Sequence, residues 1–228
     1  MKLLDITQAM QAILLHHTRG YTLWLGFTVP DSKLSALDEK WAMELGTHEP
    51  AWKRHDRRSR NIPNAVAIAG RVFAHPTTAE VVLMATDTAR QVEPHSPYHA
   101  FLRQQWRDDL PRFSHFEMVH QPTEATGKLT WTWRVKKIEL AKMEKYLIHL
   151  CDMRDIESLK HETRALLNFP MFNGIRSQVR RILRHVQRKC TACGLHYPGP
   201  DPENLPMMLK FSRTRPAAPE APYAVGGA

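Results

Sequence analysis

Five arginines recur near the C-terminal end of the 228-residue sequence, within residues 173–189. Apolar residues and arginines alternate there with the period of a helix, so they fall on opposite faces, and no acidic residue interrupts the stretch. The arginines therefore lack acidic partners one turn away, and they must meet solvent, acids from elsewhere or an external anion. Because the planar guanidinium binds phosphate at two points, we expect a nucleic-acid backbone as their ligand. They are Arg176, Arg180, Arg181, Arg184 and Arg188.

A second group of cations lies in the first third of the sequence, next to Trp52. Residues 47–64 hold few large apolar side chains, which predicts an exposed connection. Cationic side chains beside an aromatic ring can bind a nucleic-acid backbone while the ring stacks on an exposed base. We expect this role for the group, with a mobile surface loop as the alternative. The cations are Lys53, Arg54, Arg57, Arg58 and Arg60.

Two cysteines and two histidines could form a metal site. Cys190 and Cys193 are separated by two residues, with His185 five positions before and His196 three positions after them. Two thiolates and two imidazoles can complete a tetrahedral zinc site, so zinc is the one cofactor that the sequence suggests. The alternative is a pair of reduced, partly buried cysteines at a helix end. A redox-active pair is disfavoured because Cys190 follows a helix instead of beginning one.

Composition and charge narrow the class of protein. The sequence is 43% hydrophobic and 24% charged, which is typical of soluble globular proteins. Thirty-two Lys and Arg against 23 Asp and Glu give a net charge of +9, so we expect anionic partners. No apolar run approaches the ~20 residues of a membrane span, and no signal peptide is evident. With three cysteines, too few for a disulfide scaffold, these features predict a cytoplasmic protein without a membrane partner.

Hydrophobic periodicity predicts the elements that position these residues. Strands are expected over residues 21–30, 65–74, 80–86, 113–121 and 128–140, and helices over 1–20, 31–46, 98–110, 141–168 and 173–189. In the last strand Trp131 and Trp133 are expected in the core, which leaves Thr130, Thr132, Arg134 and Lys136 as a polar face.

This order predicts an α+β fold in which helices pack on one face of an antiparallel sheet. We expect a core domain over residues 1–170, a basic helix with a Cys/His knuckle over 171–212, and a disordered, proline-rich tail over 213–228.

The order of elements, together with residues 144–150 (Glu-Lys-Tyr-Leu-Ile-His-Leu), resembles rolling-circle (HUH-type) replication initiators of small plasmids and filamentous phages. In that family an antiparallel sheet carries two metal-binding histidines one residue apart, and a later helix carries a nucleophilic tyrosine. The resemblance implies a DNA-nicking endonuclease that uses Tyr146, although the present sequence holds no such histidine pair. Judged by periodicity alone, Tyr146 is expected in the core.

Residues 168–183 also resemble uncharacterised proteins from bacterial plasmids and conjugative elements. This resemblance implies a role in replication, transfer or defence of a mobile element. Our leading hypothesis is therefore a nucleic-acid-binding protein with little or no enzymatic activity. The alternatives are the endonuclease, and a subunit of a larger nucleoprotein complex whose arginine helix docks an acidic partner.

Overall fold

The computed structural model of the protein describes residues 1–71, 77–91, 96, 98, 111–123 and 126–207. It is an α+β structure, which confirms the predicted fold class. Within these residues the strands are β1 (Leu3–Leu4), β2 (Leu23–Pro30), β3 (Ala65–Arg71), β4 (Thr78–Ala85), β5 (Arg112–Phe113), β6 (Phe116–Pro122) and β7 (Leu129–Val135). The α-helices are α1 (Ile6–Thr18), α2 (Leu34–Leu45), α3 (Ala51–Ser59), α5 (Lys137–Asp152), α6 (Ile156–Ala165) and α7 (Asn173–Ala192). Short 3₁₀ helices lie at Asp31–Lys33, Asp87–Gln91 and Leu166–Asn168.

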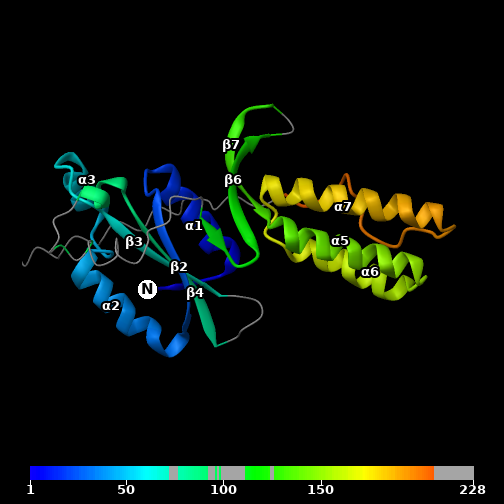
Figure 1. Cartoon of the computed structure of the whole chain (residues 1–228), viewed down its shortest axis with the longest axis horizontal. Helices are drawn as coiled ribbons and strands as arrows, with labels where there is room; N and C mark the ends of the chain where they lie inside the picture. Colours follow the sequence, from blue (N-terminus) through cyan, green and yellow to red (C-terminus); the bar gives the residue numbers. More distant parts are fainter. Residues whose placement is uncertain (72–76, 92–95, 97, 99–110, 124–125, 208–228) are drawn as a thin grey trace, which may run out of the picture.

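Two sheets and a group of three helices follow one another along the long axis of the molecule (Figure 1). The first sheet has the strand order β1-β3-β4-β2 and is antiparallel except for the short parallel pair of β1 and β3. The second sheet is antiparallel with the order β5-β6-β7. The two expected hairpins, β3 with β4 and β6 with β7, are confirmed.

Helices cover both faces of the first sheet, so the prediction of helices on one face only is wrong. On one face Met84 of β4 belongs to the same buried cluster as Met10 of α1. On the other face Leu83 is buried in a cluster with Trp41 of α2. Successive strand residues point to opposite faces, and β4 is buried at consecutive positions from Val81 to Ala85. A strand of this kind needs an apolar cover on each side.

Residues 51–59 form helix α3, where the composition predicted an exposed connection. The helix begins directly after Pro50, a residue that suits a helix start because its φ is fixed and it has no N–H to satisfy. Ion pairs four residues apart, Glu49 with Lys53 and Asp56 with Arg60, support the turns. No residue of α3 is fully buried, which explains why the sequence shows no apolar period there.

The β6–β7 hairpin lies between α1 and α7. On one face the indole Nε1 of Trp133, which is fully buried, donates to the carbonyl oxygen of Met10 at 2.9 Å. On the other face the backbone N–H of Gly174 donates to the hydroxyl of Thr132 at 3.1 Å. The side chain of Gln178 in α7 bonds both the N–H and the carbonyl of Val135, at 2.8 and 3.0 Å. Trp133 therefore faces the core as expected, and Thr132 faces α7.

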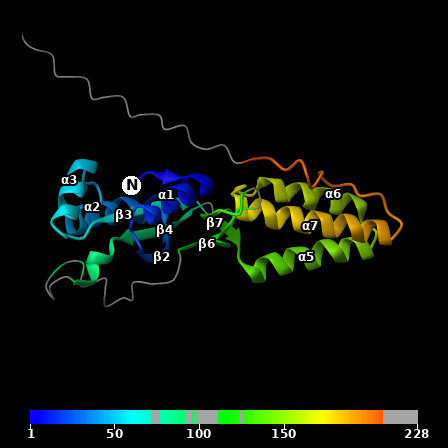
Figure 2. The same cartoon turned by 90° about the horizontal axis from the view of Figure 1, so that it is seen from above.

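Helix α5 packs against both α6 and α7 (Figure 2). The single helix expected over residues 141–168 is broken at Arg154, whose φ of 55° ends α5, and Asp155 then caps α6 by accepting from the N–H of Ser158. Helix α7 has the predicted amphipathic form, because Ile175, Val179, Ile182, Leu183 and Val186 are buried.

The predicted boundary between residues 170 and 171 stays a prediction, while α7 shares one buried cluster with α1, β7 and α5. The tail over residues 213–228 and most of the helix expected over 98–110 lie outside the described residues. None of the described helices is long and apolar enough to cross a membrane.

Candidate nucleic-acid interface

A groove runs along the outward face of α7, and we call it the arginine groove. It has a volume of about 600 Å³ and contains four of the five predicted arginines. None of its lining residues, all of which belong to the described part of α7, is acidic. They are Ser177, Gln178, Arg180, Arg181, Arg184, Gln187 and Arg188.

A second concavity, which we call the hairpin pocket, lies between the β6–β7 hairpin and the start of α7. Its volume is about 350 Å³, and it shares Ser177 and Arg180 with the arginine groove. The fifth predicted arginine, Arg176, lies here. The remaining lining residues are uncharged: Gln121, Pro122, Thr123, Thr130, Thr132 and Asn173. The structure therefore brings all five arginines to two adjoining concavities.

Acids of α5 hold the flank of α7 that is turned towards them. His185 Nδ1 lies 2.7 Å from Glu144 Oε1, and Lys189 Nζ lies 2.6 Å from Asp152 Oδ1. Hydrogen bonding and charge attraction from Asp152 raise the pKa of Lys189. These pairs fix which flank of α7 faces α5; Arg180, five residues before His185, lies about 140° around the helix from it.

The segment that follows α7 turns back along the helix and meets two of the arginines. Arg184 pairs with Glu203 at 2.7 Å, and Arg180 Nε donates to the carbonyl oxygen of Pro202 at 3.3 Å. Arg176 and Arg181 form no ion pair with any residue that the structure describes. The helix itself supplies no acid, as its sequence indicates, and the return segment supplies one.

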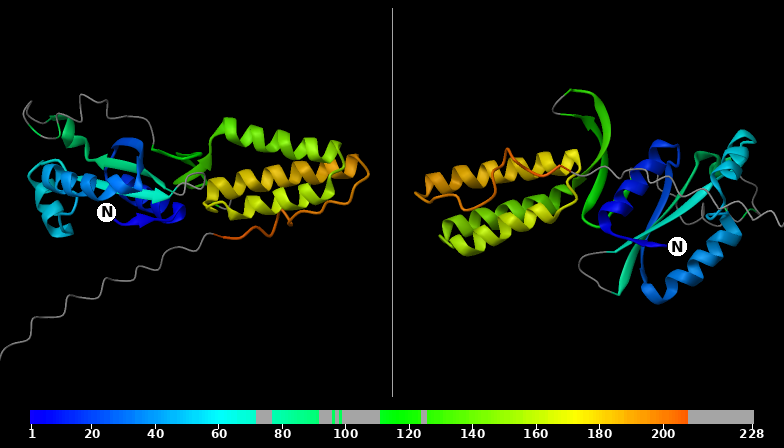
Figure 3. Two further views of the ribbon diagram at one scale, coloured as in Figure 1. Left: turned by 90° about the horizontal axis from the view of Figure 1, so that it is seen from below. Right: turned by 180° about the vertical axis from the view of Figure 1, so that it is seen from behind.

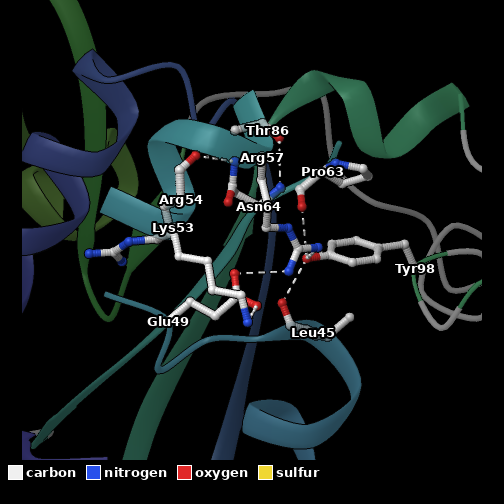
Figure 4. A network of polar contacts seen from close by, with 9 residues as sticks. All are labelled: Leu45, Glu49, Lys53, Arg54, Arg57, Pro63, Asn64, Thr86 and Tyr98. Carbon is white, nitrogen blue, oxygen red and sulfur yellow. Dashed lines mark hydrogen bonds and ion pairs between the residues drawn. The ribbon is translucent and has the colours of Figure 1, made fainter. Parts of the chain in front are cut away.

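The cations of α3 are positioned in a different way, and Figure 4 shows their surroundings. Glu49 Oε2 pairs with Arg57 at 3.0 Å and Oε1 with Lys53 at 3.1 Å. Arg57 also reaches the hydroxyl of Tyr98 at 3.5 Å, and that hydroxyl donates to the carbonyl oxygen of Leu45 at 2.8 Å. Burial raises the pKa of Tyr98 to about 12, so its hydroxyl stays protonated and donates. Arg57 therefore joins α3 to the fold.

The other members of this group divide between internal bonds and solvent. Arg58 donates to the carbonyl oxygen of Arg19 at 2.6 Å, Arg60 pairs with Asp56 at 3.1 Å, and Arg54 is half-buried. Trp52 is 72% exposed and keeps the accessibility that stacking on a base requires. Helix α3 and helix α7 lie at opposite ends of the molecule (Figures 1 and 3), so the two basic groups do not form one surface.

The four predicted zinc ligands are not brought together. The thiol of Cys190 lies 3.7 Å from that of Cys151, and both are buried. Burial raises the pKa of Cys151 to about 12, which keeps this thiol protonated. His185 is bonded to Glu144. Among the described residues no group of three or more His, Cys, Asp or Glu side chains could hold a metal ion.

Tyr146 is 48% exposed, so its expected place in the core is wrong. Glu144, two residues earlier on α5, faces α7 through its bond to His185. At about 100° per residue, Tyr146 lies about 200° around α5 from Glu144. The structure therefore does not bring Tyr146 to the arginine groove.

The uncharged side of the hairpin pocket was only partly foreseen. Thr130 and Thr132 belong to the predicted polar face of the strand, but Gln121, Asn173 and Ser177 were not singled out. Gln121 is the cross-strand partner of Thr130, and the two lie on the same face of the hairpin. The sequence did not identify Gln121, because its place in the pocket depends on this register.

The chain matches no model of a known protein family. It likewise matches no curated protein and no solved structure. Its function must therefore be inferred from the two concavities beside α7 and from the charges that line them.

Proposed function

We propose that the protein binds the phosphate backbone of a nucleic acid along the arginine groove. The observation that carries this proposal is the convergence of five guanidinium groups on two adjoining concavities, none of whose lining residues in the described structure is acidic. Glu203, in the segment after α7, pairs with Arg184. Guanidinium groups on one helix face repel one another, and phosphate oxygens relieve that repulsion while accepting their hydrogen bonds.

The neutral residues of the groove support the same ligand. The hydroxyl of Ser177 and the amide of Gln187 can donate to phosphate oxygens that the arginines hold, while the amide of Gln178 is already bonded to Val135. The net charge of +9 favours association with a polyanion at low salt. The resemblance to proteins of plasmids and conjugative elements favours a role in replication, transfer or defence of a mobile element. DNA nicking by Tyr146 stays a prediction, and the position of this tyrosine adds no support to it.

The test compares two variants that each lose three positive charges. In the first, Arg176, Arg181 and Arg188 of α7 are replaced by Gln; in the second, Lys53, Arg58 and Arg60 of the α3 group are replaced by Gln. Binding of a fluorescent oligonucleotide is measured by anisotropy over a series of salt concentrations. We expect the α7 variant to lower the slope of log K against log salt by about 0.7–0.9 per lost contact, and the α3 variant to leave it nearly unchanged.

Equal losses in the two variants would mean that net charge alone drives binding, and the proposal would fail. An unchanged slope in a folded α7 variant would have the same consequence. Polyglutamate is the matched competitor: if it displaces the oligonucleotide at equal charge concentration, the groove selects acidic chains in general and an acidic protein partner becomes the better assignment.

A further inference from the structure

The hairpin pocket differs from the arginine groove in the chemistry of its walls. On the hairpin side it presents Gln121, Thr123 and Thr130, which are amide and hydroxyl groups, and on the helix side it adds the amide of Asn173. Amides and hydroxyls both donate and accept hydrogen bonds. Phosphate oxygens only accept, whereas the edges of nucleic-acid bases present donors and acceptors together. Because the hairpin side also lacks a cation, this wall offers donors and acceptors to a base and leaves the phosphates to the arginines of α7.

The size and the apolar part of the pocket agree with such a ligand. A volume of about 350 Å³ falls within the ~300–1,000 Å³ of small-molecule sites. The exposed ring of Pro122 lies among the lining residues and offers an apolar surface to the face of a base. Arg176 and Arg180 stand at the helix side, where they can hold the phosphate attached to the same nucleotide.

The shape of the pocket separates single strands from duplexes. Proteins that read a duplex insert a protruding helix or strand pair into its major groove, because the base edges are recessed there. In this protein the amide and hydroxyl groups line a concavity between the β6–β7 hairpin and the start of α7. A base that is paired inside a duplex cannot enter a recess, whereas an unpaired base can turn out of its strand and do so.

We infer that the ligand is a single-stranded nucleic acid and that the hairpin pocket accepts one unpaired base. This inference rests on the proposed function. The hairpin pocket and the arginine groove share Ser177 and Arg180, so the strand continues from the pocket along α7. From Ser177 to Arg188 this path is about 16 Å long, at 1.5 Å per residue of helix.

The experiment measures binding of a short single-stranded oligonucleotide, as DNA and as RNA, and of the corresponding DNA duplex at one salt concentration. We expect the tighter of the two single strands to bind about tenfold more tightly than the duplex. The double substitution Thr130→Val and Gln121→Met removes the polar groups and keeps the size of both side chains. It is expected to weaken single-strand binding about tenfold without changing the salt slope, because no charge is lost.

Thr28→Val is the matched control, since Thr28 is an exposed strand residue of β2, in the other sheet. It should leave binding unchanged. Duplex binding as tight as single-strand binding would overturn the inference, as would undiminished binding by a double variant that retains the wild-type melting temperature. In both cases the proposed function would stand if the α7 arginine variant still lowers the salt slope. Absence of binding to all three oligonucleotides would instead overturn the proposed function.

Discussion

Helix α3 and helix α7 are both rich in arginine, but they differ in how many nearby acids form ion pairs with their cations. Near α3, Glu49 pairs with Lys53 and Arg57, and Asp56 pairs with Arg60. Acids of the same segment therefore form ion pairs with three of the five cations. Helix α7 contains no acid, and its outward arginines face a groove whose lining is free of carboxylates among the described residues.

The comparison shows that a basic run becomes a candidate binding surface where its own segment supplies no acids to pair with it. At α3 the cations serve the protein's own tertiary structure, with Arg57 as the central residue. At α7 the acids of α5 pair with His185 and Lys189 on the flank, and Glu203 of the segment after the helix pairs with Arg184. Sequence composition alone does not distinguish these two cases.

The largest difference that we expect between the two helices is the effect of an arginine substitution on stability. We expect Arg57→Met to lower the free energy of unfolding by about 2 kcal/mol, because Glu49 then keeps only the more exposed Lys53 as a partner. The side chains of Arg57 and Glu49 are 19% and 15% exposed. Arg181→Met, at an exposed site of α7, should cost less than about 0.5 kcal/mol. Chemical denaturation measures both. Similar losses would show that the two helices do not differ in this way.

A second, smaller effect concerns pH. Partial burial raises the pKa of Glu49, but hydrogen bonds and charges of Lys53 and Arg57 outweigh it and hold this pKa below its usual 4.5. A carboxylate with a lowered folded-state pKa contributes stability above its unfolded pKa, and that contribution is lost as the pH falls through the folded value. We therefore expect wild-type stability to drop more steeply below about pH 4.5 than that of Glu49→Gln.

Thermal melting over a pH series measures this difference. Glu44→Gln, which removes a carboxylate from the exposed end of α2, is the control and should retain the steep wild-type loss. If Glu49→Gln is as acid-sensitive as the wild type, the ion pairs of α3 do not contribute as we describe.

The smallest effect is on affinity. Glu203 pairs with Arg184 and competes with a phosphate for the same guanidinium. We expect Glu203→Gln to strengthen oligonucleotide binding about two- to threefold, as the loss of an exposed ion pair implies. Glu44→Gln changes the net charge equally at the other end of the molecule and should have less effect. Anisotropy titrations compare the two variants, and equal gains would assign the change to net charge.

Local patterns predicted much of the fold. Aromatic and β-branched residues identified β2, and alternating apolar residues identified β7. The helical period identified α2 and α7, the latter with its buried and basic faces. Helix α3 was missed because it buries no residue fully and so has no apolar period. Its acid-to-base pairs at a spacing of four, Glu49 with Lys53 and Asp56 with Arg60, were the available signal.

Tertiary packing determined what the sequence could not indicate. The arginines were found from their spacing, but the hairpin pocket depends on the register that pairs Gln121 with Thr130 and on the approach of α7 to β7. The ion pair between Arg184 and Glu203 forms because the segment after α7 runs back along the helix. Hydrophobic periodicity does not predict this path of the chain. The second cover on the first sheet could have been predicted from the continuous apolar run of β4, from Val81 to Ala85.

Strand β7 is bonded on both of its faces, and this has a thermodynamic consequence for the hairpin pocket, which it lines. The indole of Trp133 ties it to α1, and Gln178 and Gly174 tie it to α7. Gly174 is closely fitted, because a Cβ there would lie 2.4 Å from the carbonyl oxygen of Trp133. Walls held from two sides lose little conformational entropy when a flexible strand enters. If the proposed function holds, the entropy lost on binding comes mainly from the nucleic acid, and ligands that are already unpaired and extended are favoured.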